Sequence, residues 1–181
     1  MNDKITLDEL MAVSKKTPVL YTDADDECAV PFIQANTFTT VIDLMSKLKS
    51  CPMTYEEIAS YCNFEERQSS YYYNAGNYLG LFYKHENKVY LTKLGKKIIR
   101  LSEKERNLEL VSCMLRHQIF SEMFSYITTM SDKACLYGDN ERITLGIIKN
   151  RMSELNVCNQ PLIDRRASSV LNWLKWIFEL I

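Results

Sequence analysis

Residues 54–91 constrain the fold of this 181-residue chain more than any other stretch. Thr54 stands before a short apolar-periodic segment, and Glu57 follows three residues later, which is the spacing of a reciprocal helix capping box. A short helix is therefore expected over residues 54–61, followed by a turn at Asn63.

A longer helix is expected over residues 65–79, and Gly80 follows it as a C-terminal glycine. Two β-prone runs, 81–83 and 89–91, flank a polar tip at residues 84–88, which indicates a short hairpin. Helix, turn, helix and hairpin in this order predict a winged helix-turn-helix, a scaffold that lays its second helix in a DNA groove.

Another helix is expected before this unit, over residues 39–49. Its apolar residues recur every three or four positions and form a single stripe of Val41, Ile42, Met45 and Leu48. We predict a mainly α fold in which a winged helix-turn-helix at residues 38–101 is followed by a helical bundle at residues 102–181.

The helix at 65–79 has two different sides. The side expected to face the core consists of Phe64, Gln68, Tyr71, Tyr72, Ala75 and Leu79. The opposite side carries residues that hydrogen-bond base edges and phosphates, namely Arg67, Ser70, Asn74 and Asn77. Tyr73 falls between the two sides, where its hydroxyl is free to donate to a phosphate. A solvated face or a protein contact is the alternative interpretation.

Two lysines flank the expected hairpin tip. Lys84 and Lys88 stand where the wing of such a domain meets backbone phosphates. His85 lies between them, either as a proton switch or as an exposed residue without a function.

The first 37 residues form an acidic leader with a net charge of −4, whereas residues 38–100 carry +3 and residues 101–181 are neutral. The positive excess therefore lies on the predicted winged helix and supports a few phosphate contacts. Thr6 and Glu9 indicate one capped helix in the leader. Four of the five residues at 23–27 are acidic, and we expect a solvated loop there, with a hard-cation site as the alternative.

The bundle at residues 102–181 is expected to contain a second helix-turn-helix-like unit. Its parts are a helix at 143–155, a turn at 156–159 and a helix at 162–180 with Pro161 in its first turn, all after a linker at 131–140. Three residues near the start of the last helix are candidates for a phosphate or guanine contact, namely Arg165, Arg166 and Ser169. Ion pairing of the arginines with carboxylates such as Asp164 is the alternative.

The sequence predicts neither a metal-binding site nor a membrane-spanning segment. The six cysteines include no C-x-x-C pair and the two histidines lack metal-ligand spacing, so we expect reduced structural thiols and no cofactor. No apolar run reaches the roughly 18 residues that a bilayer requires, and the chain opens on a polar segment, so a cytoplasmic location is expected.

Signatures of catalysis are also missing from the sequence. It holds no phosphate-binding loop, no G-x-G-x-x-G and no G-x-S-x-G. Cys113 and His117 stand four apart on one expected helix and are able to meet, but a buried structural cysteine is the simpler interpretation. We expect no catalytic activity in this chain alone, although it could be the non-catalytic part of a nuclease.

The strings FEERQSSYYYNAGNYLGL, VYLTKLGKKI and RRASSVLNWLKWI resemble modules near the N-termini of bacterial type II restriction-endonuclease-like proteins. This resemblance covers residues 38–180 and implies target recognition within a restriction or defence protein. Such nucleases carry the pattern PD-(D/E)-x-K, which this chain lacks. If the chain is complete it is a stand-alone binder, and otherwise the nuclease lies elsewhere.

We predict a DNA-binding module that places the helix at 65–79 in the major groove and the wing at 81–91 on the backbone. Its expected partner is double-stranded DNA, with a second copy of the chain or a nuclease as candidate partners. The predicted contacts are Arg67, Gln68, Ser70, Tyr73, Asn74, Asn77, Lys84, Lys88, Arg165, Arg166 and Ser169. The alternative is a protein-interaction, dimerisation or transcription-regulator module, which the near-neutral total charge and the apolar last helix favour.

Overall fold

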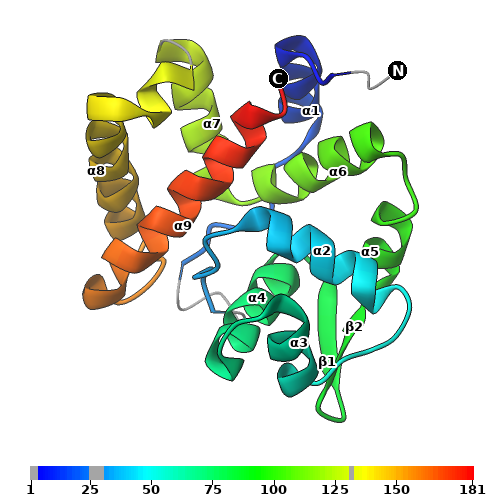
Figure 1. The fold of residues 1–181 in the computed structure, drawn as a ribbon. Coiled ribbons are helices and arrows are strands. Elements are labelled where there is room, and N and C mark those ends of the chain that lie inside the picture. The colour runs from blue at the N-terminus through cyan, green and yellow to red at the C-terminus, as the bar shows by residue number, and fades with distance from the viewer. Residues whose placement is uncertain (1–3, 25–30, 131–132) are drawn as a thin grey trace.

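The computed structural model describes residues 4–24, 31–130 and 133–181, and over these residues the chain is mainly α-helical, as expected. Within this described part there are nine α-helices, one short 3₁₀ helix and one antiparallel two-stranded sheet (Figure 1). In chain order these elements are α1 (Leu7–Lys16), α2 (Phe38–Leu48), α3 (Tyr55–Cys62), α4 (Glu66–Tyr78), β1 (Phe82–His85), β2 (Lys88–Leu91), α5 (Lys93–Ile98), α6 (Glu103–Leu115), α7 (Gln118–Met130), η1 (Lys133–Leu136), α8 (Gly138–Glu154) and α9 (Gln160–Glu179).

The signals at the ends of α3 and α4 are confirmed. The Thr54 backbone N–H donates to Glu57 Oε2 (2.8 Å) and the Glu57 backbone N–H donates to Thr54 Oγ1 (3.2 Å), which completes the capping box. Asn63 ends α3 in the left-handed region (φ 56°), which Asn enters more easily than most residues. Gly80 (φ 74°) follows α4 in the same region, as a C-terminal glycine does.

The hairpin has longer strands and a tighter tip than expected. β1 continues to His85 and β2 begins at Lys88, so only Glu86 and Asn87 form the turn. Both turn residues have positive φ (45° and 63°), as in the type I′ turns whose twist suits antiparallel strands. The prediction of a polar tip at 84–88 was wrong in extent, because its outer residues continue the strand pairing.

A third segment pairs with β2 close to the hairpin turn. The Val89 N–H donates to the Met53 carbonyl (2.7 Å) and the Met53 N–H donates to the Val89 carbonyl (3.2 Å). Met53 lies between α2 and α3, so this antiparallel bridge fastens the hairpin to the helices that precede it.

The buried side of α4 is rotated from the predicted one. Its buried residues are Ser69, Tyr72, Ala75, Gly76 and Tyr78, whereas Gln68 and Tyr71 are only half-buried. Two contacts set this rotation. Gly76 lies against the Phe82 ring, where a Cβ atom would come within 1.9 Å, and the Ser69 hydroxyl donates to the Tyr55 carbonyl (2.7 Å).

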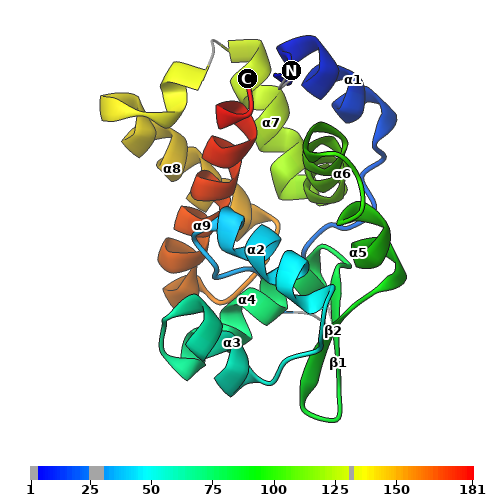
Figure 2. The same cartoon turned by 45° about the vertical axis from the view of Figure 1, so that its right-hand side comes forward.

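The leader is packed into the body of the protein. Its helix α1 begins with the expected capping box of Thr6 and Glu9 and lies against α6, as Figure 2 shows. Further along, the Trp173 indole N–H donates to the Ala35 carbonyl (2.8 Å). Residues of the leader, of positions 38–101 and of the C-terminal helices thus share one continuous core.

The last two helices, α8 and α9, run in opposite directions and pack obliquely against each other (Figure 1). Lys175 pairs with Glu141 near the start of α8 (3.0 Å), and Lys149 pairs with Asp164 near the start of α9 (2.7 Å). The second helix-turn-helix-like unit stays a prediction for these two helices. Gly138 (φ 60°) begins α8, so the predicted linker at 131–140 was too long within its described part.

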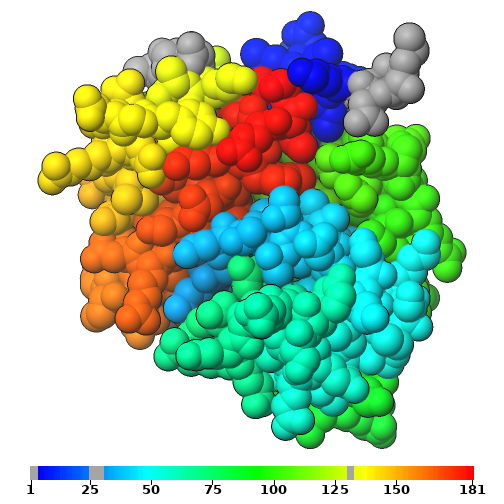
Figure 3. Space-filling model, viewed as in Figure 1, coloured from blue at the N-terminus to red at the C-terminus, as the bar shows by residue number. Residues whose placement is uncertain are grey.

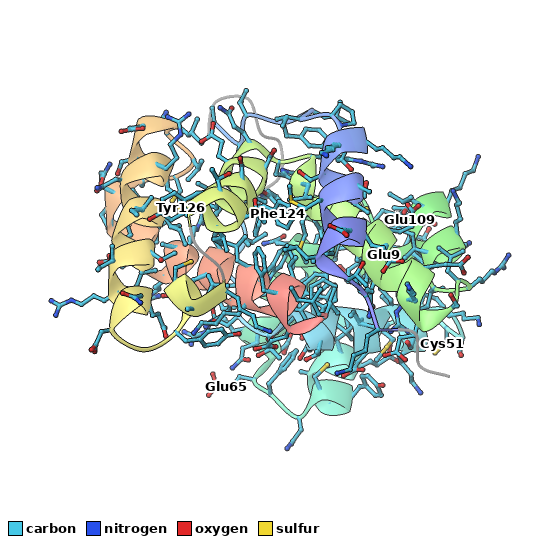
Figure 4. All side chains as sticks on the ribbon, turned by 90° about the horizontal axis from the view of Figure 1, so that it is seen from above. Glu9, Cys51, Glu65, Glu109, Phe124 and Tyr126 are labelled. Carbon is cyan, nitrogen blue, oxygen red and sulfur yellow. The ribbon has the colours of Figure 1, made fainter. Side chains whose placement is uncertain are left out.

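Aromatic side chains fill the centre of the C-terminal half. Phe124 is 1% exposed and stacks on Phe178 with a centroid distance of 5.4 Å. Viewed from above in Figure 4, Phe124 lies among the helices, whereas Cys51 and Glu65 lie at the periphery. Among the described residues, no helix combines the length and the apolar character needed to cross a bilayer.

Candidate nucleic-acid interface

A polar cleft lies where α4, the start of α9 and the segment before α2 meet. Figure 3 shows these three segments in green, orange and blue on one face. The cleft has a volume of about 490 Å³ and is lined by Gln34, Ala35, Asn36, Thr37, Arg67, Gln68, Tyr71, Tyr72, Arg165 and Ser168. It therefore brings together three predicted DNA-contact residues, Arg67, Gln68 and Arg165, from helices far apart in the sequence.

The two arginines of this cleft are exposed and stand on rigid elements. Arg67 occupies the first turn of α4, and Arg165 lies in the second turn of α9. Neither forms an ion pair with a described residue. The alternative pairing of Arg165 with Asp164 is not formed, since Asp164 is held by Lys149 (2.7 Å).

Ser169 does not face solvent, which corrects its predicted DNA contact. Its side chain is fully buried, because it lies on the side of α9 that faces the core. The hydroxyl donates to Asn36 Oδ1 (2.8 Å) instead. Arg166 is half-buried and its Nε atom is enclosed without a hydrogen-bond partner among the described residues, so it is not a free cation either.

The outward side of α4 is less open than predicted. Asn77 is half-buried and its amide donates to the Phe82 carbonyl (2.9 Å), so this group holds the hairpin and is not free to read a base. The Ser70 hydroxyl donates to the Arg67 carbonyl (2.8 Å). Asn74 is half-buried, which leaves Arg67 as the most exposed member of the predicted face.

The hairpin lysines have different surroundings. Both are exposed, but the Lys84 ammonium lies over the Tyr55 ring, 4.0 Å from its centroid. Tyr73 is half-buried at the boundary, as expected, and burial raises the pKa of its hydroxyl. Lys88 therefore offers the more available charge near the hairpin tip.

Four exposed basic residues in α5 and just after it were missed from sequence. Lys93, Lys96, Lys97 and Arg100 are all exposed and none of them forms an ion pair with a described residue. Figures 1 and 2 place α5 beside the C-terminal end of α2, away from the hairpin tip. The signal was present in the string KLGKKIIR, which carries four of the nine basic residues at positions 38–100.

A buried polar group was also missed. His117 Nδ1 lies 2.6 Å from Asp23 Oδ1, and His117 Nε2 lies 3.0 Å from the Tyr78 carbonyl oxygen. The ring is stacked between Tyr21 and Tyr78. Asp23 is 1% exposed, so the expectation of a solvated loop was wrong for this residue; residues 25–27 of the acidic run lie outside the described part.

Cys113 and Cys62 are not nucleophiles of lowered pKa. Burial raises the pKa of the Cys113 thiol to about 11, and both nitrogens of His117 face other groups, so these two residues do not form a nucleophile–base pair. Burial likewise raises the pKa of Cys62 to about 11. Within the described ranges, no group of three His, Cys, Asp or Glu residues is placed to hold a metal ion.

Residues 40–181 match a protein family described as Domain of unknown function (DUF7226). The chain belongs to this family. No curated protein and no solved structure shows a significant match. The part of the chain that matches DUF7226 includes α4, the hairpin and α9, and hence every residue predicted to contact DNA.

Proposed function

We propose that this DUF7226 chain is a DNA-binding module built on a winged helix-turn-helix. The observation that carries the proposal is the Met53–Val89 bridge, because it adds a third strand segment, between α2 and α3, to the hairpin that follows α4. Three helices with strand pairing of this order support a winged-helix arrangement in which α4 reads the major groove and the β1–β2 hairpin lies on the backbone.

The available cations on this surface support the same role. Arg67 is exposed near the start of α4 and Lys88 is exposed beside the hairpin turn. An arginine at the N-terminal part of a recognition helix is well placed for bidentate contact with guanine, and a wing lysine for contact with a phosphate. The resemblance to restriction-endonuclease-like proteins extends the proposal to target recognition within a restriction or defence protein.

A salt titration of duplex binding tests the proposal. We expect affinity to fall as salt rises, because phosphate contacts release counterions, and a flat response would contradict it. Arg67→Ala is expected to weaken binding to a selected site by about 1–3 kcal/mol and to relax the preference among sequences. The matched control is Arg142→Ala, which removes an exposed arginine from the first part of α8, a different helix from α4.

A protein-interaction module is the second candidate, and the acidic starts of α3 and α4 favour it. Glu56, Glu57, Glu65 and Glu66 are all exposed there, and such a cluster repels phosphates. Tyr61 and Tyr83 are also exposed, at 47% and 43%. Sedimentation velocity with and without DNA duplex separates the two candidate functions. A tight dimer whose sedimentation does not change when duplex is added favours the protein-interaction module.

A further inference from the structure

The N-terminal ends of α2 and α4, neither of which has a side-chain cap, contribute residues to the cleft between α4 and α9. Thr37, the N-cap residue of α2, lies in the wall of the cleft and makes no capping hydrogen bond. The first turn of α4 provides Arg67 and Gln68, and its N-cap residue Glu65 also makes none. Glu65 and Glu66 already place negative charge at the start of α4, whereas the first turn of α2 holds no acidic residue, so the α2 end is the one that favours an added negative charge.

The side chains that line the cleft add donors and positive charge. Arg67 and Arg165 each carry five N–H donors, and no carboxylate is among the lining residues. The carboxylate closest to Arg165 in the chain, Asp164, is neutralised by Lys149. The cleft thus carries two positive charges that no acidic group within it offsets.

Asn36 is held in an orientation that adds a further donor. The buried Ser169 hydroxyl donates to Asn36 Oδ1 (2.8 Å), so the amide oxygen of Asn36 is bound within the protein. The Asn36 amide nitrogen makes no hydrogen bond to another described residue and is available to a ligand in the cleft. Ser169 is therefore a positioning residue for the cleft.

We propose that this cleft binds a phosphate group. Guanidinium groups, amide donors and uncapped helix N-termini are the features that recognise phosphate. A volume of about 490 Å³ lies within the range of small-molecule sites, so the phosphate comes either from a free nucleotide or from a DNA backbone. Only the second source rests on the proposed DNA-binding function.

The test compares wild type with Arg165→Gln and Arg67→Gln, which remove one charge from each wall, and with Arg142→Gln as the control. The probes are pyrophosphate, deoxyadenosine 5′-monophosphate, deoxyadenosine and a short DNA duplex. We expect at least one phosphate-bearing probe to bind and deoxyadenosine to fail. Both cleft variants should lose about tenfold or more in affinity for that probe, because each removes a bidentate charge, whereas Arg142→Gln should match wild type.

The outcomes separate the two sources and the two proposals. If pyrophosphate and the nucleotide bind and Arg165→Gln abolishes this binding, the phosphate site in the cleft is supported. That conclusion holds even if the protein fails to bind duplex, a result that would contradict the groove proposal. Duplex binding alone, with a salt slope that Arg165→Gln lowers by about 0.9, assigns the phosphate to the backbone. Unchanged duplex affinity and slope in Arg165→Gln, with no response to pyrophosphate, would overturn the cleft. Groove reading would then rest on Arg67→Gln alone, which should still weaken duplex binding.

Discussion

His117 joins three separate segments of the chain through one imidazole ring. The Tyr78 carbonyl only accepts hydrogen bonds, so His117 Nε2 carries a proton and donates to it (3.0 Å). The other ring nitrogen shares a proton with Asp23 (2.6 Å), and the pair is almost completely buried. The Tyr78 ring stacks on the imidazole at 3.6 Å, which leaves no room for water on that side.

Removing the carboxylate from this pair should destabilise the protein strongly. Asp23→Ala leaves His117 Nδ1 buried without a partner, and breaking a buried pair in this way costs about 3–5 kcal/mol. Urea unfolding followed by circular dichroism measures the change. Glu141→Ala, which breaks the more exposed pair with Lys175, is the control and should cost about 1 kcal/mol or less. Equal losses in the two variants would contradict the assigned role of Asp23.

At the scale of elements, the contact between α4 and the hairpin depends on Gly76. Replacing Gly by Ala in a helix interior usually stabilises by about 1 kcal/mol, but a Cβ at Gly76 would come within 1.9 Å of the Phe82 ring. We expect Gly76→Ala to destabilise by about 1–3 kcal/mol through overpacking. Gly146→Ala in α8 meets no atom within 4 Å and should stabilise by about 0.5–1 kcal/mol. The same sign in both thermal-unfolding measurements would show that Phe82 is not rigidly placed.

Helices α7 and α8 are joined by a bidentate ion pair that should respond to pH. Arg151 Nε and Nη2 lie 2.6 and 2.9 Å from the two carboxylate oxygens of Glu122, and these hydrogen bonds lower the Glu122 pKa. Because the folded pKa lies below the unfolded one, this stabilisation is present at neutral pH and is lost as pH falls through the folded pKa.

The variant Glu122→Gln should therefore lose about 1 kcal/mol or less at pH 7, since the pair is partly exposed. The difference from wild type should shrink as the pH falls through the lowered pKa of Glu122, where the carboxyl becomes protonated. Urea unfolding at several pH values measures both effects. Glu154, which contacts only Arg151 Nη1 and is more exposed, provides the control variant Glu154→Gln with a smaller loss. A pH-independent difference would contradict the account.

For the whole molecule, the leader should contribute to stability although it precedes the part that matches DUF7226. Leu10 is fully buried where α1 meets the rest of the core, so Leu10→Ala should cost about 2–5 kcal/mol. For a chain of this size that is a fall in melting temperature of roughly 4–20 °C. Leu7 lies on the same helix but is 45% exposed, and Leu7→Ala should change the melting temperature little. Similar melting temperatures for the two variants would mean that the leader adds nothing to the core.

Local signals in the sequence predicted the helix ends, because they join residues three or four apart. The capping box of Thr54 and Glu57 and the first-turn Pro161 are such cases. Contacts between distant residues could not be predicted. His117 and Asp23 are 94 residues apart, and the cleft exists only because packing brings α9 beside α4. Ser169 illustrates the same limit. Its polar side chain suggested a ligand contact, but its position on α9 places that side chain on the face that packs against the core.

Helix α9 reaches from the cleft to the opposite end of the protein. Its twenty residues make a rod of about 30 Å, with Arg165 near one tip and Glu179 at the other, where a second pocket also includes Lys4 and Ser102. The Trp173 indole, which donates to the Ala35 carbonyl, lies between the two ends. Because α9 is one unbroken helix that is buried along its length, the cleft and the second pocket are held by the same element.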